Sequence, residues 1–264
     1  MASAQTSYGR SDSQQGANQQ SANQPGGKAE MNAMQHVNDA ASVVKRMESE
    51  PGMNKLLSQA KGIFIVPEYG RAALGVGGSG GAGVLLVKNN DTWGEPAFYN
   101  IGSISVGVQA GAEGGPIAMV LTNDKAVNSF KQKNNFALSA DAGLTVVDWS
   151  KMAQGEAGAG DVVAWSGTKG LFGSAAIGVQ DIRYNQAQTA AYYQKQNLAA
   201  NDVISGKVRN PHAEVLKQAL AATSSGTATG SSGTMSGGAA GGGQSSGQSG
   251  SQGGSPSGTS DSNK

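Results

Sequence analysis

Two overlapping glycine-rich motifs have residue types and spacing that could support catalysis or cofactor binding. Residues 75–80 fit G-x-G-x-x-G, the fingerprint of a dinucleotide-binding turn, and residues 77–81 fit G-x-S-x-G, which would present Ser79 as a nucleophile. Both chemistries require a helix directly after the glycines, because its N-terminus receives the phosphate or completes the nucleophile turn. The residues that follow, 82–87, are instead typical of a strand. We therefore do not expect a nucleotide site here.

A hydrolase would also need a histidine as its base, and the chain contains two, His36 and His212. His212 follows Pro211 at the expected start of an outer helix, where a solvent-exposed side chain is the commoner arrangement. A serine hydrolase using Ser79 is therefore only a remote alternative, and the sequence predicts a protein that is not an enzyme. The chain has no cysteine, and two histidines in unrelated settings do not predict a metal site, so we expect no metal and no cofactor.

The charge balance and the hydropathy narrow the possible partners. The 264 residues include 19 Lys and Arg against 18 Asp and Glu, a net charge of +1, and the longest basic run is Lys45-Arg46. This balance gives no reason to predict nucleic-acid binding, which favours clustered basic residues. No stretch approaches the 18 consecutive apolar residues of a membrane-spanning helix, so we expect no transmembrane segment.

Low-complexity segments flank the central part of the chain. Residues 1–29 are rich in Gln, Ser and Asn, and residues 223–264 are rich in Gly and Ser. Neither carries enough apolar side chains to offset the entropy cost of folding, so both are expected to be disordered, with one domain over 30–222. Residues 2–4, Ala-Ser-Ala, resemble the remnant of a signal-peptide cleavage site, which predicts a periplasmic or otherwise exported envelope protein. A cytoplasmic protein is the alternative.

Periodicity and alternation predict an α+β domain. Apolar residues recur at three- and four-residue spacing over residues 30–60 and are interrupted at Pro51-Gly52, which predicts two helices. Asn123 is expected to cap a helix over 124–133. Further helices are expected over 186–203 and 211–222, and strands at 63–66, 72–77, 82–88, 97–101, 104–111, 116–122, 143–149, 161–166 and 173–184. Because the strands come in hairpin-length runs rather than alternating with helices, the sheet is expected to be antiparallel.

Glycine inside the predicted strands indicates how that sheet is shaped. Positions such as Gly77 and Gly83 lie where alternating apolar residues would otherwise continue. Glycine within a strand marks a bulge, a sharp bend or a close approach of two backbones. We therefore expect a curled, barrel-like sheet packed with several helices, with Trp93 and Phe98 in its core.

A series of short motifs, taken in order along the chain, resembles the SYLF domain family. The motifs are Ala60-Lys61-Gly62-Ile63, Pro67, the glycine run over 75–83, Trp93-x-x-Pro96-Ala97-Phe98, Gly107-x-Gln109-x-Gly111, Asn128-x-Phe130, Ser139-x-Asp141-Ala142, Lys169-Gly170-Leu171-Phe172-Gly173 and Tyr192-Tyr193. The resemblance covers roughly residues 35–206. It implies a lipid-binding domain that recognises acidic membrane lipids, which are phosphoinositides in eukaryotic relatives. In some fungal relatives it implies association with actin filaments.

Basic residues near these motifs are the candidates for contacts with anionic headgroups. The candidate lipid-binding residues are Lys45, Arg46, Lys55, Lys61, Lys169 and Arg183. The helix before Pro51 could lie at a bilayer with its apolar stripe inserted, or it could pack that stripe on the sheet, which is the commoner arrangement. The expected function is non-enzymatic binding of anionic membrane lipids at a membrane surface. The alternative is a structural or stress-related envelope protein that acts through a protein partner or self-assembly.

Overall fold

A long curved sheet organises the chain in the computed structural model, which describes residues 25–70, 80–105, 114–138, 141–156, 158–168 and 177–225. Within these residues the main sheet has nine strands, in the order β7-β11-β4-β2-β1-β6-β9-β8, with β3 paired to β2. A short second sheet pairs β10 with β5. The strands are β1 (Gly62–Tyr69), β2 (Gly81–Asn89), β3 (Thr92–Trp93), β4 (Ala97–Ile101), β5 (Ile104–Ser105), β6 (Gly115–Leu121), β7 (Asn135–Phe136), β8 (Val146–Asp148), β9 (Val162–Ser166), β10 (Gly178–Val179) and β11 (Ile182–Tyr184).

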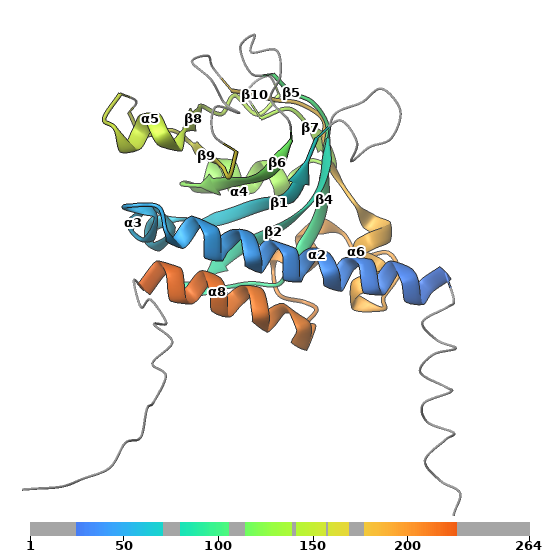
Figure 1. Cartoon of the computed structure of the whole chain (residues 1–264). Coiled ribbons are helices and arrows are strands. Elements are labelled where there is room, and N and C mark those ends of the chain that lie inside the picture. Colours follow the sequence, from blue (N-terminus) through green and yellow to red (C-terminus); the bar gives the residue numbers. More distant parts are fainter. Residues whose placement is uncertain are drawn as a thin grey trace, which may run out of the picture. The chain divides into compact units, whose positions relative to one another are not determined.

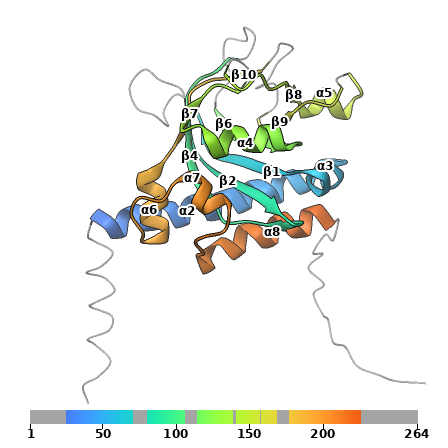
Figure 2. The same cartoon turned by 180° about the vertical axis from the view of Figure 1, so that it is seen from behind.

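Helices cover both faces of this sheet (Figures 1 and 2). They are α2 (Pro25–Glu48), α3 (Met53–Gln59), α4 (Asp124–Gln132), α5 (Trp149–Ala153), α6 (Gln186–Tyr193), α7 (Ala200–Ile204), the 3-10 turn η1 (Pro211–Ala213) and α8 (Glu214–Ser225). The predicted class is therefore confirmed: an α+β fold with a strongly curled sheet and several helices.

The central strand β1 shows why the sheet has a core on each face. Its side chains alternate, so that Ile63 and Ile65 join the cluster under α2, α3 and α8, while Phe64 and Val66 join the cluster under α4 and α7. All four are fully buried. A strand buried on both faces has no polar side to expose, which explains the continuous apolar run over 63–66.

Gly83 of β2 is required by the close approach of β1. A Cβ atom at this position would lie 2.5 Å from the Phe64 ring and 2.8 Å from the carbonyl oxygen of Ile65. No side chain larger than hydrogen fits there without displacing β1. This agrees with the close backbone approach expected from the glycines, although Gly77 lies outside the described residues.

The first two helices form as the sequence predicts. The turn at Pro51-Gly52 separates α2 from α3, and Gly52 adopts a left-handed backbone with φ of +86°. The apolar stripe of α2, including Val37, Val44 and Met47, is buried against the sheet and α8, which lies beside α2 (Figure 1). Packing on the sheet is thus the correct interpretation of this helix. Insertion of the stripe into a bilayer is wrong for this conformation.

The structure differs from the predicted elements at several places. The strand expected over 143–149 gives way to α5 at Trp149, and the strand expected over 173–184 is broken at Asp181, whose φ is 60°, into β10 and β11 of different sheets. The helix expected over 186–203 is broken between α6 and α7, where Gln194 and Asn197 have left-handed φ values of 51° and 57°. Strand β1 continues past Pro67 to Tyr69, because its register with β6 shifts at this point and a bulge tolerates proline. Finally, β8 pairs with β9 in parallel, in a sheet that was expected to be antiparallel. Strand predictions at 72–77 and over most of 104–111 lie outside the described residues.

Candidate functional site

Four of the predicted lipid-binding residues lie within residues 45–61, between the end of α2 and the start of β1. We call these four residues, Lys45, Arg46, Lys55 and Lys61, the basic surface. Lys45 and Arg46 occupy the last turn of α2, Lys55 lies on α3, and Lys61 directly precedes β1. All four are exposed, and none forms an ion pair with another described residue. The structure therefore presents four solvent-accessible positive charges within residues 45–61. The Arg46 guanidinium is directed to Gly167 at one end of the β6–β9 pair, whereas Lys61 lies beside Leu121 at the other end.

Arg46 has a structural contact as well as a charge. Its Nη2 donates a hydrogen bond to the Gly167 carbonyl oxygen at 3.2 Å, which ties the end of α2 to the residue after β9. Positive charges in the last turn of a helix also interact favourably with its dipole. Arg46 thus stabilises α2 in addition to any ligand contact. Of the four residues of the basic surface, it is the one whose side chain also bonds to another part of the described fold.

Lys88 of β2 is a cation that the sequence did not single out. Its Nζ donates to the carbonyl oxygens of Leu57 and Ser58, at 2.8 and 2.9 Å, and so caps the C-terminal end of α3. The same Nζ lies 4.9 Å from the centroid of the Trp93 ring. Burial lowers the pKa of Lys88, and the nearby charge of Lys61 lowers it further, while Asp91 acts in the opposite direction. Lys88 therefore holds in place the helix that carries Lys55.

The other two predicted residues do not join the basic surface in the structure. Arg183 lies on β11, three strand spacings or about 14 Å from β1 along the sheet. It donates to Asp181 through Nε at 2.6 Å and forms an ion pair with it. Its charge is thus compensated, unlike the four charges of the basic surface. Lys169 lies outside the described residues.

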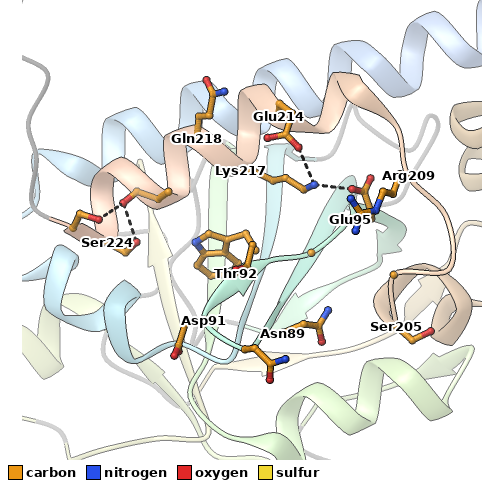
Figure 3. A pocket seen from close by; sticks show the side chains of 16 residues that line it. Asn89, Asp91, Thr92, Glu95, Ser205, Arg209, Glu214, Lys217, Gln218 and Ser224 are labelled. Atoms are coloured by element: carbon orange, nitrogen blue, oxygen red, sulfur yellow. Dashed lines mark hydrogen bonds and ion pairs between the residues drawn. The ribbon is translucent and has the colours of Figure 1, made fainter.

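A polar pocket of about 860 Å³ lies between the β2–β3 hairpin, the segment after α7, and α8 (Figure 3). The hairpin turn places Asn90 and Asp91 in left-handed conformations, with φ values of 49° and 63°, which is typical of a tight turn between two antiparallel strands. The residues that line the pocket include Asn89, Asp91, Thr92, Glu95, Arg209 and Lys217. Sequence reasoning did not identify this pocket.

A nearly buried ion pair forms part of the pocket wall. Lys217 of α8 donates to Glu95 at 2.6 Å and to Glu214 at 3.0 Å (Figure 3), and Glu95 also accepts the backbone N–H of Asn210 at 3.1 Å. The Glu95 side chain is 6% exposed and that of Lys217 18%. Burial works to lower the pKa of Lys217, but its hydrogen bonds to Glu95 and Glu214 outweigh this and raise the pKa overall. Lys217 is therefore held in its protonated form by partners within the pocket wall.

The two histidines considered as catalytic bases lie in separate parts of the described structure. His212 is half-buried rather than solvent-exposed as expected, and its Nε2 has no hydrogen-bond partner among the described residues. His36 lies on α2 in contact with Gln188 of α6. Ser79 lies outside the described residues. Within the ranges that the structure covers, no group of three or more His, Asp or Glu side chains is placed to hold a metal ion. No described helix combines the length and apolar character needed to cross a bilayer.

Comparison with protein families gives a match over the second half of the domain. Residues 102–223 match the model of the family described as "Ysc84: Las17-binding protein actin regulator". The matched region runs from the end of β4 into α8, so it includes the sheet strands β6, β9 and β11 and most of α8.

Comparison with curated proteins gives distant relatives of the same kind. The proteins named "SH3 domain-containing YSC84-like protein 1" from Bos taurus and Mus musculus are each 24% identical to this chain over 170 residues, and the Homo sapiens protein is 23% identical. The aligned region covers 62% of this chain and 49% of each relative. The chain thus spans about half the length of the curated relatives it matches.

Proposed function

We propose that this chain, which carries a domain of the Ysc84 (SYLF) family, binds acidic membrane lipids through its basic surface. The family resemblance expected from the ordered motifs is confirmed by the match over residues 102–223. The family description names binding to Las17 and regulation of actin, and it names no reaction. The proposal therefore concerns which molecule the domain binds and which face it uses.

The observation that carries the proposal is the set of four exposed and unpaired cations at Lys45, Arg46, Lys55 and Lys61. A basic residue close to an anionic bilayer contributes about 1 kcal/mol of binding free energy. Glu48 and Glu50 lie within the same segment and reduce its net charge to +2. Because the apolar stripe of α2 is buried, the contact is electrostatic and peripheral, without insertion of the helix.

Flotation of the full chain with phosphatidylcholine vesicles of increasing phosphatidylserine content tests this proposal. The combined variant Lys45→Gln, Arg46→Gln, Lys55→Gln and Lys61→Gln should reduce partitioning onto the anionic vesicles by up to several hundredfold, since each charge is worth about 1 kcal/mol. Binding by the parent should also fall as salt is added, because the Debye length shrinks to about 3 Å at 1 M.

A matched control removes four positive charges elsewhere: Lys28, Lys131, Lys195 and Lys207, each changed to Gln. This variant has the same net charge as the test variant and should retain most of the binding. Equal losses in both variants would indicate a general charge effect and no defined site. Failure of the parent to bind any anionic vesicle at low salt would reject lipid binding for this protein.

A protein partner is the second candidate, and the family description as an actin regulator favours it. Co-sedimentation of the parent with actin filaments, measured beside its flotation with anionic vesicles, separates the two candidates. Self-assembly in a structural or stress-related role would instead appear as a concentration-dependent change in mass by light scattering. The location at an envelope remains a prediction, which cell fractionation would test.

A further inference from the structure

The pocket between the β2–β3 hairpin and α8 is a second concave surface, separate from the residues of the basic surface. Its walls come from residues 89–95, residues 205–209 and α8, all of which lie outside residues 45–61, which carry the four exposed cations. Its volume of about 860 Å³ is in the range of small-molecule sites. It is therefore large enough for a ligand of two or three sugar rings.

The charges in this pocket do not suit an anionic ligand. Three carboxylates line it, from Asp91, Glu95 and Glu214, against the two cations of Lys217 and Arg209. Lys217 is already bonded to two of these carboxylates. A phosphate or carboxylate on a ligand would meet more negative than positive charge, so the pocket does not extend the lipid-phosphate site proposed above.

The polar groups that remain open in the pocket are of mixed donor and acceptor type. The side chains of Asp91, Thr92 and Arg209 are exposed and make no hydrogen bond with any described residue. Asn89 donates through Nδ2 to the Ile204 carbonyl oxygen at 3.0 Å, which leaves its own side-chain oxygen to accept. Asp91 is an acceptor, Arg209 a donor and Thr92 both, and they come from opposite walls.

Neutral hydroxyl-rich molecules match this arrangement best. Each sugar hydroxyl can donate one hydrogen bond and accept others, so neighbouring hydroxyls can use a carboxylate and a guanidinium at the same time. The exposed Ala221 methyl group adds apolar wall for the C–H face of a sugar ring, and Trp93 also lines the pocket although only 5% of it is exposed. We propose that this pocket binds a neutral saccharide, held by Asp91, Thr92 and Arg209.

A saccharide of this kind could be free in solution or could be the headgroup of a neutral glycolipid, and two experimental arms distinguish these sources. In the first, the full chain labelled with ¹⁵N is titrated with maltotriose, chitotriose and galactotriose, and amide shifts are followed by NMR. In the second, it is floated with phosphatidylcholine vesicles that contain diglucosyl diacylglycerol, which carries no net charge. Saturable binding in either arm, with shifts at residues 89–95 and 205–209, is the expected result.

Three variants locate the binding. Arg209→Met keeps the aliphatic stem and removes the donors, Thr92→Val keeps the shape and removes the hydroxyl, and Asp91→Gly suits the left-handed φ of 63°. Each should weaken binding several-fold, and Arg209→Met with Thr92→Val together by about tenfold or more, the usual effect of losing two ligand hydrogen bonds. Arg183→Met, the same change on β11, should leave binding unchanged, as should the quadruple variant of the basic surface.

Several results would overturn the saccharide proposal without affecting the lipid proposal. The first is no saturable binding in either arm at concentrations up to about ten times a millimolar Kd. The second is binding that persists in the Arg209→Met and Thr92→Val variant. The third is stronger binding of glucose 6-phosphate than of the neutral sugars, which would show that the pocket selects anions. Arg209 and Thr92 are exposed, so these variants should remain folded, and a thermal melt confirms that they do.

Discussion

The basic surface and the polar pocket place charge in opposite ways. In the basic surface, four cations within residues 45–61 stand exposed and unpaired among the described residues. In the pocket, Lys217 and Glu95 neutralise each other across 122 positions of sequence and are nearly buried. Exposed charges cost the fold little and remain available to a partner. Removing one member of a buried pair leaves the other charge buried and unpaired, which destabilises the fold, and neither member is available to a ligand.

This contrast separates residues that act on a ligand from residues that maintain the structure. A charge that can be removed without loss of stability, but with loss of binding, belongs to the first group. A charge whose removal unfolds the protein belongs to the second group, whatever pocket it lines. Measuring both stability and binding for one variant shows to which group the changed residue belongs.

The largest effect is expected at Gly83, on which both regions depend. The change Gly83→Val places side-chain atoms against the Phe64 ring and the Ile65 carbonyl oxygen, so it should destabilise the protein by about 3 kcal/mol or more. Strand β2 runs from Gly83 to the pocket at Asn89 and carries Lys88, so lipid binding and the pocket should be lost together. Urea unfolding measures this, with Ala82→Val on the other face of β2 as the control. Retention of parental stability would show that β1 and β2 are not closely packed.

Glu95→Gln should produce the second largest effect. It leaves Lys217 with a single carboxylate partner, Glu214, and should reduce the free energy of unfolding by about 2 kcal/mol, less than for a fully buried pair because Lys217 is 18% exposed. Glu214 is 57% exposed, so the matched change Glu214→Gln should cost less than about 0.5 kcal/mol. Equal effects of the two changes would contradict the structural role given to Glu95. Binding to anionic vesicles should be unchanged in both variants.

Lys88→Met tests the connection between the two regions. Removing its hydrogen bonds to Leu57 and Ser58 should cost about 1 kcal/mol, because these partly exposed bonds involve a charged donor. Vesicle binding should weaken only slightly, through loosening of α3. Lys61→Met, which removes a cation without hydrogen bonds to other described side chains, should show the reverse pattern: no change in stability and a measurable loss of binding. Denaturant unfolding and flotation of the same samples give both quantities.

The smallest effect concerns the pH dependence of stability. Burial lowers the pKa of His36, and the charges of Asp39 and Glu68 only partly oppose this. A histidine whose folded pKa lies below 6.5 favours folding most when it is neutral, so its contribution is complete above pH 6.5 and is lost as the pH falls through the folded pKa. Unfolding measured between about pH 7.5 and pH 5 should therefore show falling stability, and His36→Asn should flatten this slope. An identical slope in the variant would assign the pH dependence to other groups.

Local features of the fold could be predicted from the sequence because their causes are local. Pro51-Gly52 ends one helix and begins another, and the Asn123 side chain accepts the Ala126 backbone N–H at 3.0 Å as an N-cap should. The break after Tyr193 was missed, because no glycine or proline marks it. Asn210, distant in sequence, instead bonds the Tyr192 carbonyl oxygen there at 2.7 Å. The parallel pairing of β8 with β9 likewise depends on contacts that no short pattern contains.

The difference between local and long-range causes also explains which site residues could be predicted from the sequence. The cations of the basic surface lie close together in sequence, so their charge and the amphipathic pattern of α2 were enough to propose them. The pocket is assembled from a hairpin and a helix more than a hundred residues apart, and nothing near Glu95 identifies Lys217 as its partner. The burial of Glu95, which gives its carboxylate the need for a partner, is itself visible only in the folded chain.

The packing of α8 against α2 also determines when this domain can fold during its synthesis. These are the last and the first helices that the structure describes, and they lie side by side (Figure 1). A ribosome has translated nearly all of the described chain before α8 can cover its part of the sheet, and contacts so distant in sequence form slowly. Until then, Leu57 and Met47 of the first two helices lack neighbours such as Leu216 and Leu220. The nascent chain therefore exposes an apolar face at the stage when chaperones bind, and truncation within α8 should increase aggregation during expression.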